Sequence, residues 1–143
     1  TYSNDDEHFS IPENVHIIGT MNTADRSLAM VDYALRRRFA FFNLPPTFNE
    51  KFAAYLTSEG LSKNTTGLIQ TKLNVLNSTI EADPNLGSGF QIGHSYFCSG
   101  WDTDEWQWFN NIIDYEVGPQ ILEFWFDDKP KAEVEIAKLK SRD

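Results

Sequence analysis

At 143 residues the chain can form one compact domain or two small lobes, and its 41% hydrophobic and 14% aromatic content is typical of a globular protein. The net charge of −9 argues against a nucleic-acid grip in this segment, and no apolar run approaches the roughly 18 residues that cross a bilayer. A single cysteine, Cys98, excludes an intrachain disulfide and predicts a reducing, cytoplasmic location.

The first 46 residues predict a strand–helix–strand unit. Residues 15–20 (VHIIGT) form a short, β-branched and mostly apolar run, as in a strand buried on both faces of a parallel sheet. Residues 28–38 place apolar side chains at helical spacing, and residues 39–44 form a second apolar run that ends at two prolines. Such a unit is too small to be stable alone, and the chain starts with Thr1 rather than Met, so we expect it to be a fragment of a longer protein.

Residues 47–143 predict an all-helical lobe. One helix is expected before a stop at Gly60, and a second should end near Asp83. Residues 102–126 return to a helical period that Pro119 should divide, and a final solvated helix is expected over residues 130–143. The predicted fold class is therefore α/β plus all-α.

The four tryptophans of this lobe could belong to the hydrophobic core or could form a surface on which nucleic-acid bases stack. Acidic residues surround them, which opposes nucleic acid, so we interpret them as core residues; they are Trp101, Trp106, Trp108 and Trp125.

The turn at residues 21–27 (MNTADRS) carries the first candidate site residues. It follows the predicted strand at the edge where open α/β sheets bind ligands. There Asn22 could orient a water or a phosphate oxygen, and Asp25 and Arg26 place opposite charges in one tight turn. The alternative is a plain capped turn, because Asn and Asp favour turns and helix starts for local reasons.

Three adjacent arginines, at positions 36 to 38, stand out in an acidic protein. Arg37 lies ten residues beyond Ser27, about 15 Å along a helix that runs back from the strand's carboxyl edge. If Asn22 and Arg37 both act on nucleotide, Arg37 must therefore reach the site of a neighbouring subunit as an arginine finger, with Arg38 as second candidate. The alternative is that the arginines only complement the negative end of the helix dipole.

His94 is a further candidate, since it stands beside a glycine-rich loop at a possible helix start that could face phosphate; a core or capping role is the alternative. The sequence contains no Gly-x-x-x-x-Gly-Lys-Ser/Thr loop and no convincing acidic strand end for a metal. We therefore expect the fragment alone to be inactive.

Residues 17–27 (IIGTMNTADRS), followed by residues 31–39 (VDYALRRRF), resemble the McrB family almost residue for residue. McrB proteins are AAA+ motor subunits of restriction systems specific for 5-methylcytosine. The resemblance is specific over residues 9–46 and extends to about residue 126 through residues 92–97 (IGHSYF). It implies the C-terminal part of an AAA+ module, with residues 1–46 completing the large α/β subdomain and residues 47–143 forming the helical lid.

The resemblance also implies roles and partners. Asn22 would be the sensor-1 residue, Asp25 and Arg26 belong to the same nucleotide-binding signature, and His94 lies near the sensor-2 region. The intact protein would hydrolyse GTP or ATP with Mg²⁺ in a homo-oligomeric, hexameric ring. It would drive DNA translocation beside a McrC-like nuclease subunit, contacting DNA through other regions and no membrane.

Two other functions remain open. One is a MoxR-type AAA+ remodelling ATPase, although such proteins do not usually carry the MNTADRS string. The other is a non-catalytic interaction module whose arginines bind an acidic partner surface.

Overall fold

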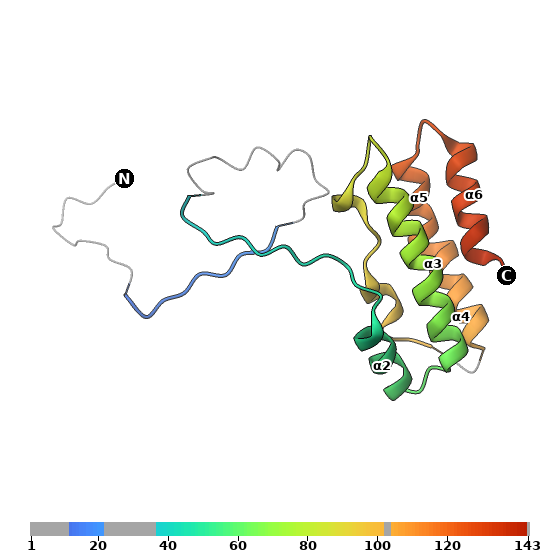
Figure 1. Ribbon diagram of the computed structural model, residues 1–143, viewed down its shortest axis with the longest axis horizontal. Helices are drawn as coiled ribbons and strands as arrows, with labels where there is room; N and C mark the ends of the chain where they lie inside the picture. Colours follow the sequence, from blue (N-terminus) through green and yellow to red (C-terminus); the bar gives the residue numbers. More distant parts are fainter. Residues whose placement is uncertain (1–11, 22–36, 102–103, 143) are drawn as a thin grey trace, which may run out of the picture.

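The computed structural model describes residues 12–21, 37–101 and 104–142, and within these ranges the helices lie beyond residue 49. Figure 1 shows them gathered side by side, with two segments without helices or strands, residues 12–21 and 37–46, to one side of them. Residues 37–46 run directly into the helical bundle. We call residues 47–142 the helical part.

The helical part contains α2 (Glu50–Ser58), α3 (Lys63–Ala82), α4 (Glu105–Ile112), α5 (Gly118–Phe124) and α6 (Lys129–Lys140). Two short 3₁₀ helices, η2 (Ser88–Phe90) and η3 (His94–Phe97), interrupt the connection between α3 and α4. A π-helical segment, η4 (Ile113–Val117), joins α4 to α5 without a break.

Side-chain caps explain where the main helices begin. The carboxamide of Asn49 accepts hydrogen bonds from the backbone N–H groups of Lys51 and Phe52 at the start of α2. Ser62, Asp104 and Asp128 cap α3, α4 and α6 in the same manner. After α2 the chain turns at Gly60, whose φ of +103° lies in the region that glycine adopts readily. The predicted first and second helices are therefore confirmed, with their ends near the expected residues.

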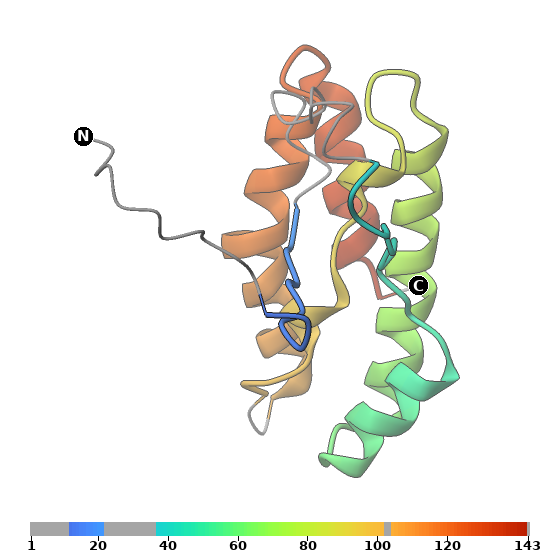
Figure 2. The ribbon, with the colours of Figure 1, turned by 90° about the vertical axis from the view of Figure 1, so that its left-hand side faces the viewer.

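The core forms around α3. Its buried residues Ile69, Leu73, Leu76 and Ile80 recur on one helical face. This face is covered by α2 and α6, and α6 also packs on α5, so the helices form one body with one hydrophobic core (Figure 2). The tryptophan prediction is confirmed, because Trp108 and Trp125 are buried in that core while Trp101 and Trp106 pack against it.

Pro119 was predicted to divide the helical stretch 102–126 in two. Instead of a break, the structure has a π-helical segment, η4, just before this proline. Proline in a helix clashes with the carbonyl four residues earlier, and a wider turn relieves that crowding. The N–H of Gly118 donates to the carbonyl of Ile113, five residues earlier. A Cβ on Gly118 would lie 2.5 Å from that carbonyl oxygen, so glycine is required at this position.

The final helix differs from the prediction in one respect. α6 forms where a solvated helix was expected, but it buries Ala132, Glu135 and Leu139. Glu135 is buried because Lys138 Nζ lies 2.6 Å from its carboxylate, so a charged residue can face the other helices. The many charged residues of this segment therefore led to the prediction of a solvated helix, although one face of α6 is buried.

The two strands predicted at residues 15–20 and 39–44 are not confirmed. Both segments lack regular secondary structure, and their apolar side chains are exposed, with Ile18 93% and Leu44 90% accessible. A strand exists through hydrogen bonds to a neighbouring backbone, and no described residues pair with either segment. The helix predicted over residues 28–38 lies outside the described residues except for Arg37 and Arg38, which form a turn.

Candidate functional site

The predicted site residues are distributed between described and undescribed parts of the chain. Asn22, Asp25 and Arg26 lie outside the described residues. Arg37 and Arg38 are exposed at the start of the extended segment 37–46, and Arg37 already interacts with a neighbouring group. The printed contacts of the His94 side chain are with Thr47, Phe48 and Phe52 and with none of the other predicted site residues, so the described residues do not gather the predicted set into one site.

His94 packs where the extended segment meets the helical part. Its Nδ1 lies 3.4 Å from the backbone N–H of Thr47 and accepts a hydrogen bond from it. Its ring stands edge-to-face against Phe48 and Phe52, with centroids 6.4 and 6.1 Å away. Because Nδ1 accepts, a neutral ring carries its proton on Nε2. These contacts fit the packing and capping alternative, and η3, four residues long, adds little helix dipole.

Two polar side chains of α3 fix the same junction. Gln70 Nε2 donates to the backbone carbonyls of Phe48 and Asn49, at 3.2 and 2.9 Å. Asn74 Nδ2 donates to the Phe48 carbonyl at 3.3 Å. The start of α2 is thus held by side chains from α3 and η3 together. Sequence reasoning missed Gln70 and Asn74, because a polar residue on a helix gives no signal of a contact more than 20 residues away.

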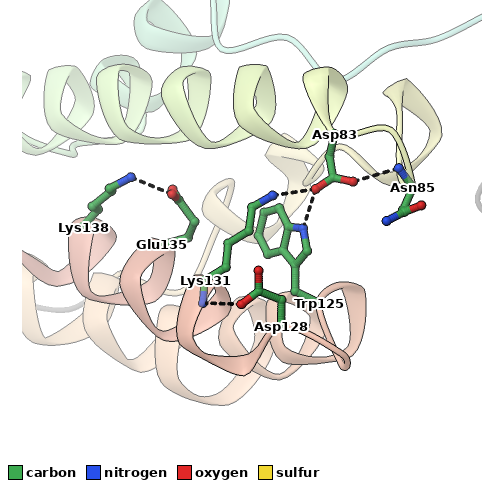
Figure 3. Close-up of polar contacts among 7 residues, drawn as sticks. All are labelled: Asp83, Asn85, Trp125, Asp128, Lys131, Glu135 and Lys138. Atoms are coloured by element: carbon green, nitrogen blue, oxygen red, sulfur yellow. Dashed lines mark hydrogen bonds and ion pairs between the residues drawn. The ribbon is translucent and has the colours of Figure 1, made fainter.

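Asp83 organises the opposite end of α3. Its carboxylate accepts hydrogen bonds from Lys131 Nζ at 2.6 Å, Trp125 Nε1 at 2.8 Å and the backbone N–H of Asn85 at 2.8 Å (Figure 3). These bonds, that of Lys131 first, lower the pKa of Asp83 from 3.8 to about 2 despite opposing desolvation. Lys131 also lies 4.8 Å from the Trp125 ring centroid, so this network ties α3 to the α5–α6 corner.

Glu105 joins the starts of α3 and α4. Its carboxylate accepts from the backbone N–H of Ser62 at 2.8 Å, from the Ser62 hydroxyl at 2.5 Å and from the Thr65 hydroxyl. Desolvation would raise the pKa of Glu105, but these hydrogen bonds together outweigh it and hold the pKa below its usual value. Asp83 and Glu105 therefore clamp the two ends of α3.

The described residues contain no group of three or more His, Cys, Asp and Glu side chains that could hold a metal ion. No described helix is both long enough and apolar enough to cross a membrane. The hydrogen bonds of Asp83 and Glu105 join the two ends of α3 to neighbouring elements, and the described helices share one hydrophobic core.

Two comparisons with known proteins match this architecture. Residues 68–133 match the family described as McrB, alpha-helical lid domain. The chain is also 46% identical over 145 aligned positions to the type IV methyl-directed restriction enzyme EcoKMcrB subunit of Escherichia coli strain K12. That alignment covers 97% of this chain and 32% of the relative, so the chain spans about a third of the relative's length. The chain belongs to the McrB family, and its helical part contains the α-helical lid domain of that family.

Proposed function

We propose that the chain is part of a McrB-like motor subunit that hydrolyses GTP or ATP, and the match of residues 68–133 to the McrB lid carries this proposal. Residues 1–46 would complete the large α/β subdomain of an AAA+ module as a strand, a helix and a strand. Residues 47–143 would be the lid. The two segments found exposed and unpaired, 15–20 and 39–44, are suitable as strands once a neighbouring sheet covers them.

The packing of the helical part suggests how the lid would respond to nucleotide. Gln70, Asn74 and His94 fix the start of α2 to α3 and η3. Pro45 and Pro46, just before this junction, restrict the backbone. A displacement of the segment 37–46 would therefore move the lid as a rigid body rather than unwind α2. Such a movement would change how neighbouring subunits pack.

Each candidate site residue receives a role in this scheme. Asn22 would orient the attacking water in its own subunit, with Asp25 and Arg26 in the same signature and His94 on the lid side. Arg37, with Arg38 as second candidate, would neutralise developing charge on the phosphates bound by a neighbouring subunit. The described residues offer Mg²⁺ no set of ligands, so we assign the ion no position in this part of the chain.

The whole assembly would be a hexameric ring that drives DNA translocation together with a McrC-like nuclease subunit. Residues 47–143 hold fifteen acidic and eight basic residues. This excess of acids makes the lid an unfavourable surface for a phosphate backbone, so the DNA would be held by other regions.

The test uses the full-length protein and measures both nucleotide hydrolysis and nucleotide binding, with GTP and ATP compared. Arg37→Ala should reduce turnover by about 10³-fold or more while changing the nucleotide Kd by no more than about twofold, because a finger acts across an interface. Arg142→Ala is the matched control, since it removes an arginine that lies on Trp106.

Two results would contradict the assignment of Arg37. One is a loss of nucleotide binding as large as the loss of turnover, and the other is an equal loss of turnover in Arg142→Ala. For Asn22, the Asn22→Ala variant should lower turnover in rings that still assemble, whereas Asn64→Ala, in the first turn of α3, should not. Turnover at the wild-type rate would remove the sensor role from Asn22.

A further inference from the structure

The chain passes from an exposed to an anchored state just before α2. Leu44 is 90% exposed, whereas Phe48 is only 4% exposed. The Phe48 ring stands edge-to-face against three aromatic rings of the helical part, those of Phe52, His94 and Phe97. Between Leu44 and Phe48 lie two prolines, Pro45 and Pro46, which restrict the backbone. The segment 37–46 is therefore anchored to the helical part directly after its last residue.

Two amide side chains of α3 hold the main chain at this anchor. Gln70 Nε2 donates to the carbonyl oxygens of Phe48 and Asn49, at 3.2 and 2.9 Å. Asn74 Nδ2 donates to the carbonyl oxygen of Phe48 at 3.3 Å. The two residues are four positions apart on α3 and therefore share one face of the helix. We call Gln70 and Asn74 the amide pair.

The start of α2 is capped without the amide pair. The Asn49 carboxamide accepts hydrogen bonds from the first turn of α2, and the backbone N–H of Ala53 donates to the Asn49 carbonyl at 3.0 Å. Phe48 precedes the helix, so the hydrogen bonds to its carbonyl come from the amide pair instead. The amide pair therefore fixes where the incoming chain lies on α3, which the capping of α2 does not require.

We infer that Gln70 and Asn74 are positioning residues for nucleotide hydrolysis, a role that rests on the proposed function. Arg37 is the first residue of the segment 37–46, and the amide pair holds the main chain just beyond the last residue of that segment. The segment is thus the covalent connection between the proposed arginine finger and the helical part. By fixing one end of this connection, the amide pair sets the place from which Arg37 reaches the neighbouring subunit.

The test removes both donors in the full-length protein. Gln70→Met combined with Asn74→Leu keeps side chains of similar size that cannot donate. We expect kcat to fall about tenfold, while the nucleotide Kd and the number of nucleotides bound per subunit stay within about twofold. Gln70→Met alone, the milder variant, should lower kcat about threefold.

A matched control makes the same two replacements away from the anchor. Gln107→Met removes a hydrogen bond to Asn111 within α4, and Asn64→Leu alters an exposed residue in the first turn of α3. This double variant should keep the wild-type kcat. A lid that is merely damaged would instead bind fewer nucleotides per subunit, which separates a positioning role from a structural one.

Mixed rings show in which subunit the amide pair acts. If it positions Arg37, rings mixed with Asn22→Ala subunits should regain about a quarter of the wild-type rate, because one variant supplies an intact Asn22 and the other a correctly placed Arg37. Rings mixed with Arg37→Ala subunits should be no faster than the amide-pair variant alone, because each interface then lacks a correctly placed finger.

Four results would overturn the role of the amide pair: wild-type kcat in both of its variants, an equal loss in the control, a rise in nucleotide Kd as large as the fall in kcat, or recovery with Arg37→Ala rather than with Asn22→Ala. A failure of the proposed function would show separately, in an unmodified full-length protein that hydrolyses neither GTP nor ATP.

Discussion

Replacing Asp83 with asparagine keeps the shape of the side chain and removes the charge that holds the end of α3 against Trp125 and Lys131. The carboxylate is well shielded, with 5% of the side chain exposed, whereas Lys131 is 36% exposed. The pKa of Asp83 falls from 3.8 to about 2 on folding, which corresponds to roughly 2 kcal/mol of stability at neutral pH. Because solvent screens Lys131, we expect Asp83→Asn to lower the free energy of unfolding by about 1 to 2 kcal/mol.

The stabilising contribution of Asp83 should depend on pH. A carboxyl whose pKa is lowered by folding stabilises the protein above the pKa of the unfolded chain, and the effect is lost as the pH falls through the folded pKa. The contribution of Asp83 should therefore be complete at pH 7, fall by about half near pH 3 and disappear below about pH 2. The difference in unfolding free energy between the variant and the wild type should shrink accordingly.

The assay is urea unfolding of both chains, followed by circular dichroism at pH 7 and at several values down to pH 3. Asp127→Asn, which alters an exposed carboxylate in the turn before α6, serves as the control and should change stability by less than about 0.5 kcal/mol. The reasoning is refuted if Asp83→Asn matches the wild type at pH 7, or if its deficit is as large at pH 3 as at pH 7.

The remaining predictions concern two other positions that fix the helices. Gly118→Ala should lower the free energy of unfolding by about 1 to 3 kcal/mol, because its Cβ would lie 2.5 Å from the Ile113 carbonyl oxygen. Gly67→Ala in α3 should raise the free energy of unfolding by up to about 1 kcal/mol, because its Cβ meets nothing within 4 Å. Thermal unfolding of the two variants checks this, and a lower Tm for Gly67→Ala than for Gly118→Ala would contradict it. Asn77→Ala should lower the free energy of unfolding by about 2 to 4 kcal/mol. The buried Asn77 carboxamide accepts a hydrogen bond from the backbone N–H of Ile92 at 2.7 Å and donates one to the backbone carbonyl of Ile92 at 3.0 Å, and both would be lost. Urea unfolding beside the exposed control Asn64→Ala tests that estimate, and equal stability of the two variants would refute it.

The helices could be predicted because their signals are local. The apolar side chains of α3 recur at helical spacing, Gly60 marks the turn after α2, and Asp83 marks the end of α3. The buried face of α6 escaped prediction, since the burial of Glu135 depends on its ion pair with Lys138. The π-helix also escaped, because Pro119 indicates an interruption but not whether the helix widens or breaks.

The two predicted strands show the limit of a pattern that depends on partners. Residues 15–20 and 39–44 are apolar enough for a buried sheet, but the described residues provide no backbone to pair with them. The candidate site has the same limitation. Arg37 and Arg38 were selected on the expectation that they serve a neighbouring subunit, and a single chain contains no such neighbour. His94 differs, because its contacts lie within the chain and join it to Thr47, Phe48 and Phe52.

Mixing two impaired variants of the full-length protein tests most directly whether Asn22 and Arg37 act on the same nucleotide from different subunits. In a ring assembled at random from Asn22→Ala and Arg37→Ala subunits, about a quarter of the interfaces would combine an intact Asn22 with an intact Arg37. The proposed motor predicts that the mixture regains up to about a quarter of the wild-type rate of hydrolysis, although each variant alone hydrolyses nucleotide more slowly than the mixture. A mixture that stays as slow as its components, while still forming mixed rings, would contradict an arginine finger supplied by a neighbouring subunit.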